Sequence, residues 1–567
     1  MKMNIKLTAF ATGLVLASAS AIAAGPGKGS TPYEVWAADQ SNSVAGVASR
    51  GVSGSYIWVW DGKDVGDQIK GNSTATPIKI DLYDAFDSSL VEVDTTGTPT
   101  GETLGSSPNF GRLHGMIADP QQKYMNINSF VPGGGYVGIM DGETKEAVAL
   151  FRVTQTDAGL SGSGRSLHMS FWNNDGSALL LANLHGRILE RIDVTRDADG
   201  NITNANYNLG ASLNVGGALS SIADEATAFT GPGMVSTVSG SYDAVAGLGG
   251  LTPSGAPRQG AERPTNVIVC PIVSDTDNVY ITFGGGGLLV ADGNNTPMNI
   301  VAEYDRASVN GAGCGGVQSG DFVYLNAGAS AGGAGATQST MTVYAIDDAA
   351  IAAGNGGVNT PEPVVVYRDV DDTDGNAANT ATIGATTGPA SIADGQLPGV
   401  TTRRDAHGMA ITNDGKYIHQ ADRLQNVVEV IDTASMSRVG TYDLTSANGK
   451  GAGVGPCEAA SVSDDPGLPS NDPTPDLMEA TPDGKYMVVA TRGPVPVSVG
   501  HNAQGSCPGV GIIKLSHNGD SGKLITVLRT TNTVDTAPQS APGGHAYTGA
   551  EHSDPHGASV RMKVEEM

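Results

Sequence analysis

The sequence is short of aromatic and cationic residues, and each shortage argues against a class of function. Phe, Trp and Tyr make up 5% of the chain, which offers few of the aromatic platforms that a polysaccharide lyase would need for sugars. That function stays a weaker alternative. The 32 Lys and Arg are outnumbered by 58 Asp and Glu, so the formal net charge is −26. This sign argues against nucleic acid and anionic membrane surfaces as partners.

Long apolar runs are also scarce. The first 24 residues carry Lys2 and Lys6, an apolar run over 7–19 and small residues over 21–24. This pattern predicts a secretory signal peptide over 1–24, with the mature chain in the periplasm. No later segment has eighteen consecutive apolar residues, so no membrane span is predicted.

Cysteine is rare as well, with four in the chain. They form no Cys-x2-Cys or Cys-x-x-Cys-His motif, so structural zinc and c-type haem find no support. An even number of cysteines in an exported protein favours disulfides. Cys457 and Cys507 are expected to form a disulfide that holds an insertion of the sixth unit in place. Cys270 and Cys314 are expected to pair too, with a metal or thiol site as the alternative.

What the sequence does contain is a repeat. Residues 404–432 read as two antiparallel strands around an Asn-Asp-Gly turn, followed by a third strand, and residues 165–193 copy this pattern. His407 stands seven residues before Asp414 of the turn, and His168 stands seven before Asp175. Self-similarity of this kind indicates a repeat architecture.

The same spacing identifies six equivalent residues, and the motif over 556–561, which resembles the one that begins at His407, supplies a seventh. These seven residues are here called the anchor positions. The seventh begins a unit near the C-terminus that lacks its later strands. Residues 33–61 resemble those missing strands. A ring closed in this way has no exposed sheet edge. The sequence therefore predicts an all-β fold, a single seven-bladed β-propeller over 25–567 with long loop insertions, closed by pairing of the N- and C-terminal strands. The anchors are His114, His168, Cys270, Cys314, His407, Asp476 and His556.

The anchors predict a metal site, because the first strand of every propeller blade lines the central channel. Five polar anchors form an unbroken arc around the ring, and converging imidazoles suit copper, zinc or iron. The alternative is that each histidine only bonds the next blade's backbone and holds the ring together. The predicted metal ligands are His114, His168, His407, Asp476 and His556.

Two further residues are candidate catalytic groups. Arg404 precedes His407, as Arg112 and Arg165 precede the first two histidine anchors, and these arginines would attract an anion or orient ligands. Glu479 lies three residues after Asp476 and would act as a general acid or base.

Other residues have two interpretations each. Met116 and Met409 follow a His-Gly pair and would be either soft ligands or core residues, because the glycine suggests a bulge in the strand. Two stretches space their side-chain oxygens as calcium sites do, with plain turns as the alternative. These stretches comprise Asp197, Asp199 and Asn201, and Asp369, Asp371 and Asp374.

The motifs Asn413-Asp-Gly-Lys-Tyr417 and Asn426-Val-Val-Glu-Val-Ile-Asp432 resemble the YVTN-type propeller repeats of exported bacterial and archaeal proteins. With histidines in the channel, the chain also resembles the copper propellers of nitrous oxide reductase and thiocyanate dehydrogenase. Those families gather histidines from successive blades around copper and perform redox chemistry on small linear molecules. Nitrous oxide reductase has an additional cupredoxin domain, which thiocyanate dehydrogenase lacks. The resemblance to thiocyanate dehydrogenase is therefore the closer of the two.

Two functions follow as hypotheses. The first is an exported metal-dependent oxidoreductase, with copper as the expected metal, acting on a small inorganic anion or molecule in the channel. An external carrier would take its electrons, because the chain has no haem motif. The second is a non-catalytic exported propeller that binds a protein or surface partner. Bound metal distinguishes the two.

Overall fold

The computed structural model describes the strands of the ring and the shorter connections between them. It describes residues 32–41, 55–87, 112–130, 135–153, 166–214, 268–283, 287–304, 309, 313–327, 340–354, 360–370, 405–423, 426–445, 455–462, 470–496, 504–533 and 547–563. The predicted signal peptide lies outside these residues.

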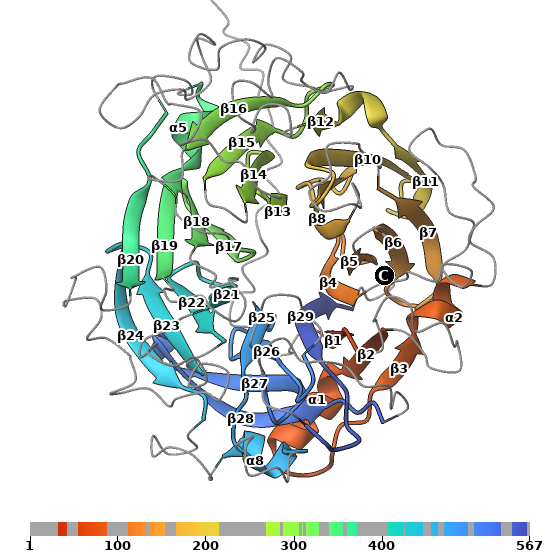
Figure 1. Ribbon diagram of the computed structural model, residues 1–567, viewed down its shortest axis with the longest axis vertical. Coiled ribbons are helices and arrows are strands. Elements are labelled where there is room, and N and C mark those ends of the chain that lie inside the picture. Colours follow the sequence, from red (N-terminus) through yellow and green to blue (C-terminus); the bar gives the residue numbers. More distant parts are fainter. Residues whose placement is uncertain are drawn as a thin grey trace, which may run out of the picture.

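Seven antiparallel sheets form a closed ring, and Figure 1 shows their innermost strands facing the axis of the ring. Blade 1 contains β4 (Arg112–Ala118), β5 (Tyr124–Phe130), β6 (Tyr136–Asp141) and β7 (Ala147–Arg152). Blade 2 contains β8 (Leu167–Trp172), β9 (Ala178–Asn183), β10 (Ile188–Arg196) and β11 (Ile202–Tyr207), with β12 (Leu213–Asn214) beside β10. Blade 3 contains β13 (Ile268–Val273), β14 (Asn278–Phe283), β15 (Leu288–Asp292) and β16 (Asn299–Tyr304).

The remaining four blades repeat the arrangement. Blade 4 contains β17 (Gly316–Ser319), β18 (Phe322–Ala327), β19 (Thr340–Asp347) and β20 (Val364–Val370). Blade 5 contains β21 (Ala406–Ile411), β22 (Tyr417–Asp422), β23 (Val427–Asp432) and β24 (Ser437–Asp443). Blade 6 contains β25 (Pro475–Ala480), β26 (Tyr486–Thr491), β27 (Gly509–Ser516) and β28 (Ser521–Arg529). Blade 7 contains β29 (Pro555–Met562), β1 (Tyr33–Asp39), β2 (Tyr56–Asp61) and β3 (Ile78–Asp81).

Blade 7 confirms the predicted closure. β29, from the C-terminal end of the chain, is its innermost strand and pairs antiparallel with β1, from Tyr33↔Met562 to Asp39↔Pro555. Arg561 adds an ion pair across this junction, with its Nη2 3.0 Å from Oε2 of Glu34. Because the closing pair is a full ladder, the ring has no open edge at this point.

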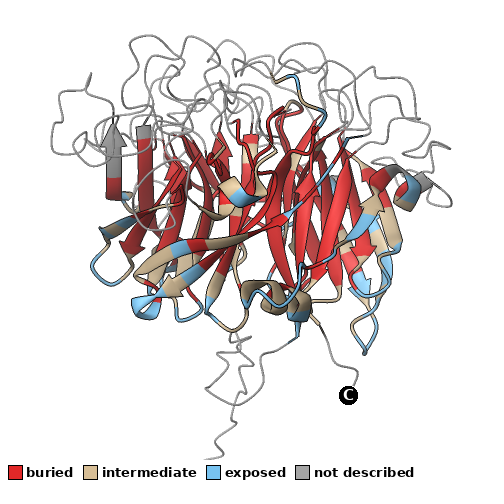
Figure 2. Ribbon diagram, turned by 90° about the horizontal axis from the view of Figure 1, so that it is seen from below, coloured by how far each residue is buried: buried red, intermediate tan, exposed pale blue. Residues whose placement is uncertain are grey.

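The core lies between neighbouring blades. Strand residues are buried along most of their length, whereas exposed residues gather at the turns, as Figure 2 shows. Met116 and Met409 are 2% and 6% exposed and pack in two of these apolar layers, so both take the predicted core role. The described helices are short: α1 (Gly62–Ile69), α2 (Leu82–Asp87), η3 (Leu209–Ala211), α5 (Asp348–Ala352), α8 (Pro456–Ala460) and η9 (His517–Gly519).

Both predicted disulfides are present. Cys270 bonds to Cys314 and joins blades 3 and 4, and Cys457 of α8 bonds to Cys507. Among the described residues, no helix is long and apolar enough to cross a membrane.

Of the two proposed calcium-binding stretches, the one from Asp197 to Asn201 lies within the described residues. It forms an Asp-Gly turn that contacts a lysine. Asp197 Oδ1 accepts hydrogen bonds from the backbone N–H groups of Asp199 and Asn201, and Nζ of Lys123 donates to Oδ1 of Asn201 at 3.1 Å. The ammonium of Lys123 thus already brings a positive charge to these oxygens. In the other stretch, Asp371 and Asp374 lie outside the described residues.

Candidate metal centre

The histidine and aspartate anchors share one backbone feature, a β-bulge in the innermost strand. His114 lies between Leu113, which pairs with Ser129, and Gly115, which pairs with Asn128, so it has no partner of its own in the ladder. A bulge re-aims a side chain out of the regular alternation. The other register shifts enclose His168, Cys270, His407, Asp476 and His556.

Glycines at these bulges let neighbouring innermost strands approach closely. A Cβ built on Gly408 would collide with the backbone oxygen of Asp476 in the next blade. A Cβ on Gly557 would lie 3.2 Å from Cα of Gly115. Because each glycine directly follows a histidine anchor, close strand contact and histidine placement depend on the same two-residue motif.

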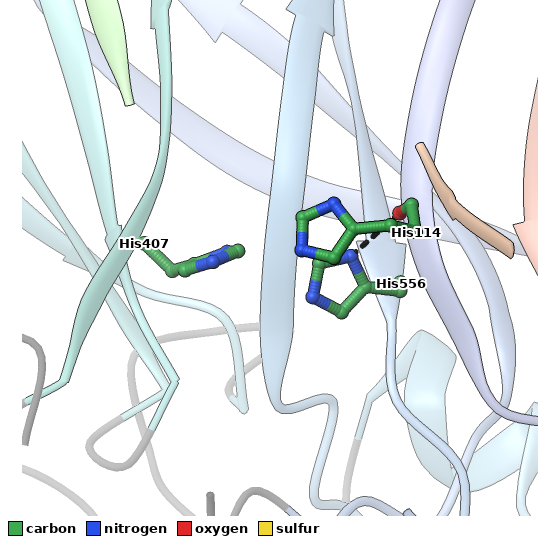
Figure 3. Close-up of side chains that lie close together, drawn as sticks. All are labelled: His114, His407 and His556. Carbon is green, nitrogen blue, oxygen red and sulfur yellow. Dashed lines mark hydrogen bonds between the residues drawn. The ribbon is translucent and has the colours of Figure 1, made fainter. Parts of the chain in front are cut away.

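Three imidazoles from innermost strands converge, and we call His114, His407 and His556 the histidine cluster (Figure 3). One potential ligand atom from each lies within 4.8 Å of the other two, and all three residues are buried. The ring centroids of His114 and His556 are 4.1 Å apart, and those of His407 and His556 are 5.0 Å apart. Nitrogens sharing one ion at 2.0–2.1 Å lie roughly 3.5 Å apart, so small side-chain movements would complete a site.

Hydrogen bonds set the tautomers of two cluster histidines. His407 donates from Nδ1 to Oδ1 of Asp476 at 2.5 Å, and His556 donates from Nδ1 to the backbone oxygen of His114 at 2.7 Å. With the proton on Nδ1, Nε2 carries the lone pair that a metal requires. Nδ1 of His114 is buried and has no hydrogen-bond partner among the described residues. Such a nitrogen would gain an interaction from a bound cation.

Asp476 belongs to a buried charge network rather than to the group of converging nitrogens. Its Oδ2 accepts from Nη1 of Arg492 at 2.8 Å and from Nη1 of Arg423 at 3.3 Å. Arg492 also pairs with Asp554, and Arg423 pairs with Asp405. Burial would raise the pKa of Asp476, but the adjacent histidines and Arg423 lower it well below its usual value. Asp476 is therefore ionised at neutral pH.

The cluster histidines are neutral at pH 7. Burial is the main cause, and it lowers the pKa of His114, His407 and His556 below the ordinary value of 6.5. The positive charge of Arg423 lowers the pKa of His407 further, and Asp476 opposes this shift. Neutral imidazole is the form that binds metal, so the ligand state needs no deprotonation step.

His168, the fourth histidine anchor, connects the cluster to the Cys270–Cys314 disulfide. Its ring centroid is 3.9 Å from that of His114. Its Nδ1 lies 3.7 Å from Sγ of Cys270 and 4.0 Å from Sγ of Cys314. The structure thus groups His168 with the two cysteines as a second set of potential ligands.

The candidate catalytic residues have different surroundings. Glu479 is half-buried on β25, accepts from the backbone N–H of Val560 at 2.9 Å, and has its pKa raised by burial to about 7. Arg404 and Arg165 lie outside the described residues. Arg112 stacks near Phe130, with Cζ 5.6 Å from the ring centroid, and its Nη1 is buried with no hydrogen-bond partner in the described part of the chain.

Sequence reasoning missed the residues that support the anchors, although the repeat contains a signal for them. Arg423 and Arg492 each lie sixteen residues after their blade's anchor, as does Phe130 after His114. Asp405 and Asp554 each lie two residues before an anchor, as does Arg112. Reading these two register positions across the units would have grouped all six residues with the anchors.

The fold and the side chains define the class of protein, a seven-bladed β-propeller with a histidine cluster on its innermost strands. No protein-family model and no curated protein matches the chain. Among solved structures, it is similar to a periplasmic gluconolactonase of Pseudomonas aeruginosa, at 11% identity and a TM-score of 0.43, over 94% of this chain and 99% of that one. A putative 6-phosphogluconolactonase of Bacteroides fragilis gives the same four values.

A third similar structure is a hypothetical selenium-binding protein of Sulfolobus tokodaii, at 10% identity and a TM-score of 0.38, over 90% of this chain and 76% of that one. The names of these three structures thus refer to lactonases and a selenium-binding protein rather than to copper propellers. At such low identities and TM-scores, the likenesses carry no argument about activity. The function must be argued from the site itself.

Proposed function

We propose that this protein is an exported, copper-dependent oxidoreductase that acts on a small inorganic anion in the propeller channel. The observation that carries the proposal is the convergence of His114, His407 and His556 with two tautomers set by hydrogen bonds. Neutral imidazoles suit copper, and copper(II) binds nitrogen sites more tightly than zinc does. The disulfides agree with export to the periplasm.

The chain's own residues would divide the remaining work. Asp476 acts as a positioning residue, because it holds the proton of His407 on Nδ1. Arg112 binds the anion, because its buried Nη1 offers an N–H donor with no described acceptor. Copper, when bound, would supply one-electron redox chemistry and polarise a bound substrate.

Glu479 would exchange protons with channel water. Its pKa of about 7 suits a group that both accepts and donates protons at neutral pH. It lies three residues along β25 from Asp476, which corresponds to roughly 10 Å of extended strand. We therefore give it a role in proton movement and no contact with the metal. Electrons would pass to an external carrier.

Metal analysis tests the proposal. After copper loading and removal of free ion, the wild type should retain at least one copper per chain, and the double variant His114→Ala/His407→Ala should retain none. The matched control is His517→Ala, which removes an exposed histidine whose side chain is 77% accessible. Thermal unfolding of each variant separates loss of ligands from loss of fold.

Activity is then screened with small inorganic anions and an artificial electron acceptor. Arg112→Gln should raise KM more than it lowers kcat, whereas Lys63→Gln, an equal charge change at an exposed site of α1, should alter neither. A wild type that holds no copper after loading would overturn the proposal.

One observation favours the alternative, a non-catalytic binding propeller. His556 donates to the backbone oxygen of His114 in the next blade, which is the bond expected of a histidine that only holds blades together. On that interpretation the double variant would unfold at lower temperature, and neither protein would hold metal. The same experiment therefore decides between the two functions.

A further inference from the structure

Three successive blades bring one imidazole and two sulfurs together. His168 comes from β8, Cys270 from β13, and Cys314 from the residues just before β17. These ligand atoms lie within 4.8 Å of one another and are a different set from the histidine cluster, although the ring centroid of His168 is 3.9 Å from that of His114. Both cysteines are buried, whereas His168 is only half-buried. The two sulfurs are therefore shielded from solvent, whereas the His168 residue is partly exposed.

The second disulfide provides an internal comparison. Sγ of Cys457 lies 3.7 Å from Oγ of Ser506, and Sγ of Cys507 lies 4.0 Å from the backbone oxygen of Asp472. These sulfur atoms thus contact a hydroxyl and a carbonyl oxygen, which are not ligands that a soft metal ion prefers. The Cys457–Cys507 disulfide therefore has a structural role. The Cys270–Cys314 disulfide differs from it because it contacts an imidazole.

We propose that the Cys270–Cys314 pair, once reduced, forms with His168 a binding site for a thiophilic d¹⁰ cation, Zn²⁺ or Cu⁺. Reduction by two equivalents of an external thiol breaks the S–S bond, adds two electrons and two protons to the pair, and joins the two reductant molecules as a disulfide. Binding then releases the two thiol protons to water as the thiolates become ligands. With the proton of His168 on Nε2, its Nδ1 supplies the third ligand.

The distances suit such a site. Bonds of about 2.3 Å to sulfur and 2.0–2.1 Å to nitrogen place the donors roughly 3.5 Å apart at tetrahedral angles. The Sγ-to-Nδ1 distances of 3.7 Å and 4.0 Å are close to this value. The two Cα atoms are 5.3 Å apart, so the thiolates need little backbone movement to share one ion. Three protein ligands would leave a fourth position for water or a substrate.

This site differs from the histidine cluster in what it selects. Two thiolates favour soft cations, whereas three imidazoles accept several borderline metals. Its occupancy would also depend on the redox state of the surroundings, because the disulfide offers no thiolate. The inference does not rest on the proposed function, since the two sites share no ligand.

Zinc stoichiometry of the folded protein tests the inference. The oxidised wild type, loaded with Zn²⁺ and freed of excess ion, is compared with protein treated with a water-soluble phosphine. The phosphine becomes a phosphine oxide as water supplies the oxygen and the two thiol protons, so it leaves no competing thiol. Thiol titration after unfolding reports which disulfides opened. We expect one more zinc per chain in the reduced wild type than in the oxidised wild type.

Variants assign the extra zinc. Cys270→Ser/Cys314→Ser and His168→Ala should each abolish it, whereas Cys457→Ser/Cys507→Ser should retain it. His407→Ala should lose zinc from the oxidised protein but keep the increment on reduction, so a failure of the proposed function remains distinguishable. With Co²⁺ in place of zinc, the increment should carry thiolate-to-metal charge-transfer absorption.

Three outcomes would overturn the inference. They are a Cys270–Cys314 bond that stays closed to the phosphine in the folded chain, open thiols without added zinc, and added zinc that persists in Cys270→Ser/Cys314→Ser.

Discussion

Nδ1 of His407 lies 2.5 Å from Oδ1 of Asp476, although the two residues come from neighbouring blades. The other oxygen of Asp476 contacts Arg423 and Arg492, so one carboxylate connects an imidazole to two buried guanidiniums. His407 is thus oriented by the packing of two blades rather than by its own strand alone. This relationship makes Asp476 the most informative single position at the site.

Asp476→Asn should weaken metal binding 10- to 100-fold, because the amide cannot provide the charge that orients a ligating histidine. It should also lower the free energy of unfolding by about 3–5 kcal/mol, since two buried arginines lose an ionic partner. Competition with a chelator measures the first effect and urea denaturation the second. Asp414→Asn, in an exposed turn of blade 5, is the control. Equal metal affinity in Asp476→Asn and wild type would contradict the assigned role.

Gly408→Ala should cost about 1–3 kcal/mol of stability, because the new Cβ meets the backbone oxygen of Asp476 and a backbone atom cannot rotate away. The displaced strand should also lose metal. In the same blade, a Cβ on Gly440 would lie an ordinary 3.5 Å from its nearest neighbour outside the adjacent residues, the backbone oxygen of Asp520, so Gly440→Ala is the matched control. Thermal unfolding and metal content are compared. If both variants behave alike, close approach at the bulge is not what requires glycine.

His419 should make the protein less stable at acid pH. It accepts from Tyr442 Oη at Nδ1 and donates from Nε2 to the backbone oxygen of Gly519, and burial lowers its pKa from 6.5 to about 4. The unfolded chain binds the proton first, so this stability is present above pH 6.5 and is lost as pH falls through 4. The loss amounts to about 3 kcal/mol between pH 7 and pH 4.

The variant His419→Gln removes that titration. The difference in unfolding free energy between wild type and variant should therefore narrow as the pH falls from 7 to 4, as followed by urea denaturation. His517→Ala, at an exposed histidine, should show no such trend. A pH-independent difference for His419→Gln would argue against a depressed pKa.

Glu479 should have the opposite pH dependence. Burial raises its pKa from 4.5 to about 7, although the N–H of Val560 opposes the shift. Its stabilising contribution is present below pH 4.5 and is lost as pH rises through 7. Glu479→Gln should therefore be more stable than wild type by about 1–3 kcal/mol at pH 8 and equal to it at pH 4. Denaturant titrations at the two pH values check this, and a wild type more stable than the variant at pH 8 would refute it.

Much of the architecture could be predicted because a repeat carries its own register. The spacing between His407 and Asp414 recurs along the chain and located six anchors, and the motif that begins at His556 identified the closing strand. All anchors except Cys314, which lies just before β17, lie on an innermost strand. The cysteine pairs followed from the same register. The conformation of each anchor was harder to foresee, because a bulge is a relation between two strands and only its glycine is visible in one.

The sequence by itself determined the ring, its closure and the residue type at each anchor, since these depend on local periodicity and on equal spacing. Only the tertiary structure decided how the anchors divide. His114, His407 and His556 converge, His168 meets the Cys270–Cys314 pair, and Asp476 is held by arginines. The division depends on contacts between blades, where angles and approach distances are set by packing of whole sheets. No spacing along one chain encodes those distances directly.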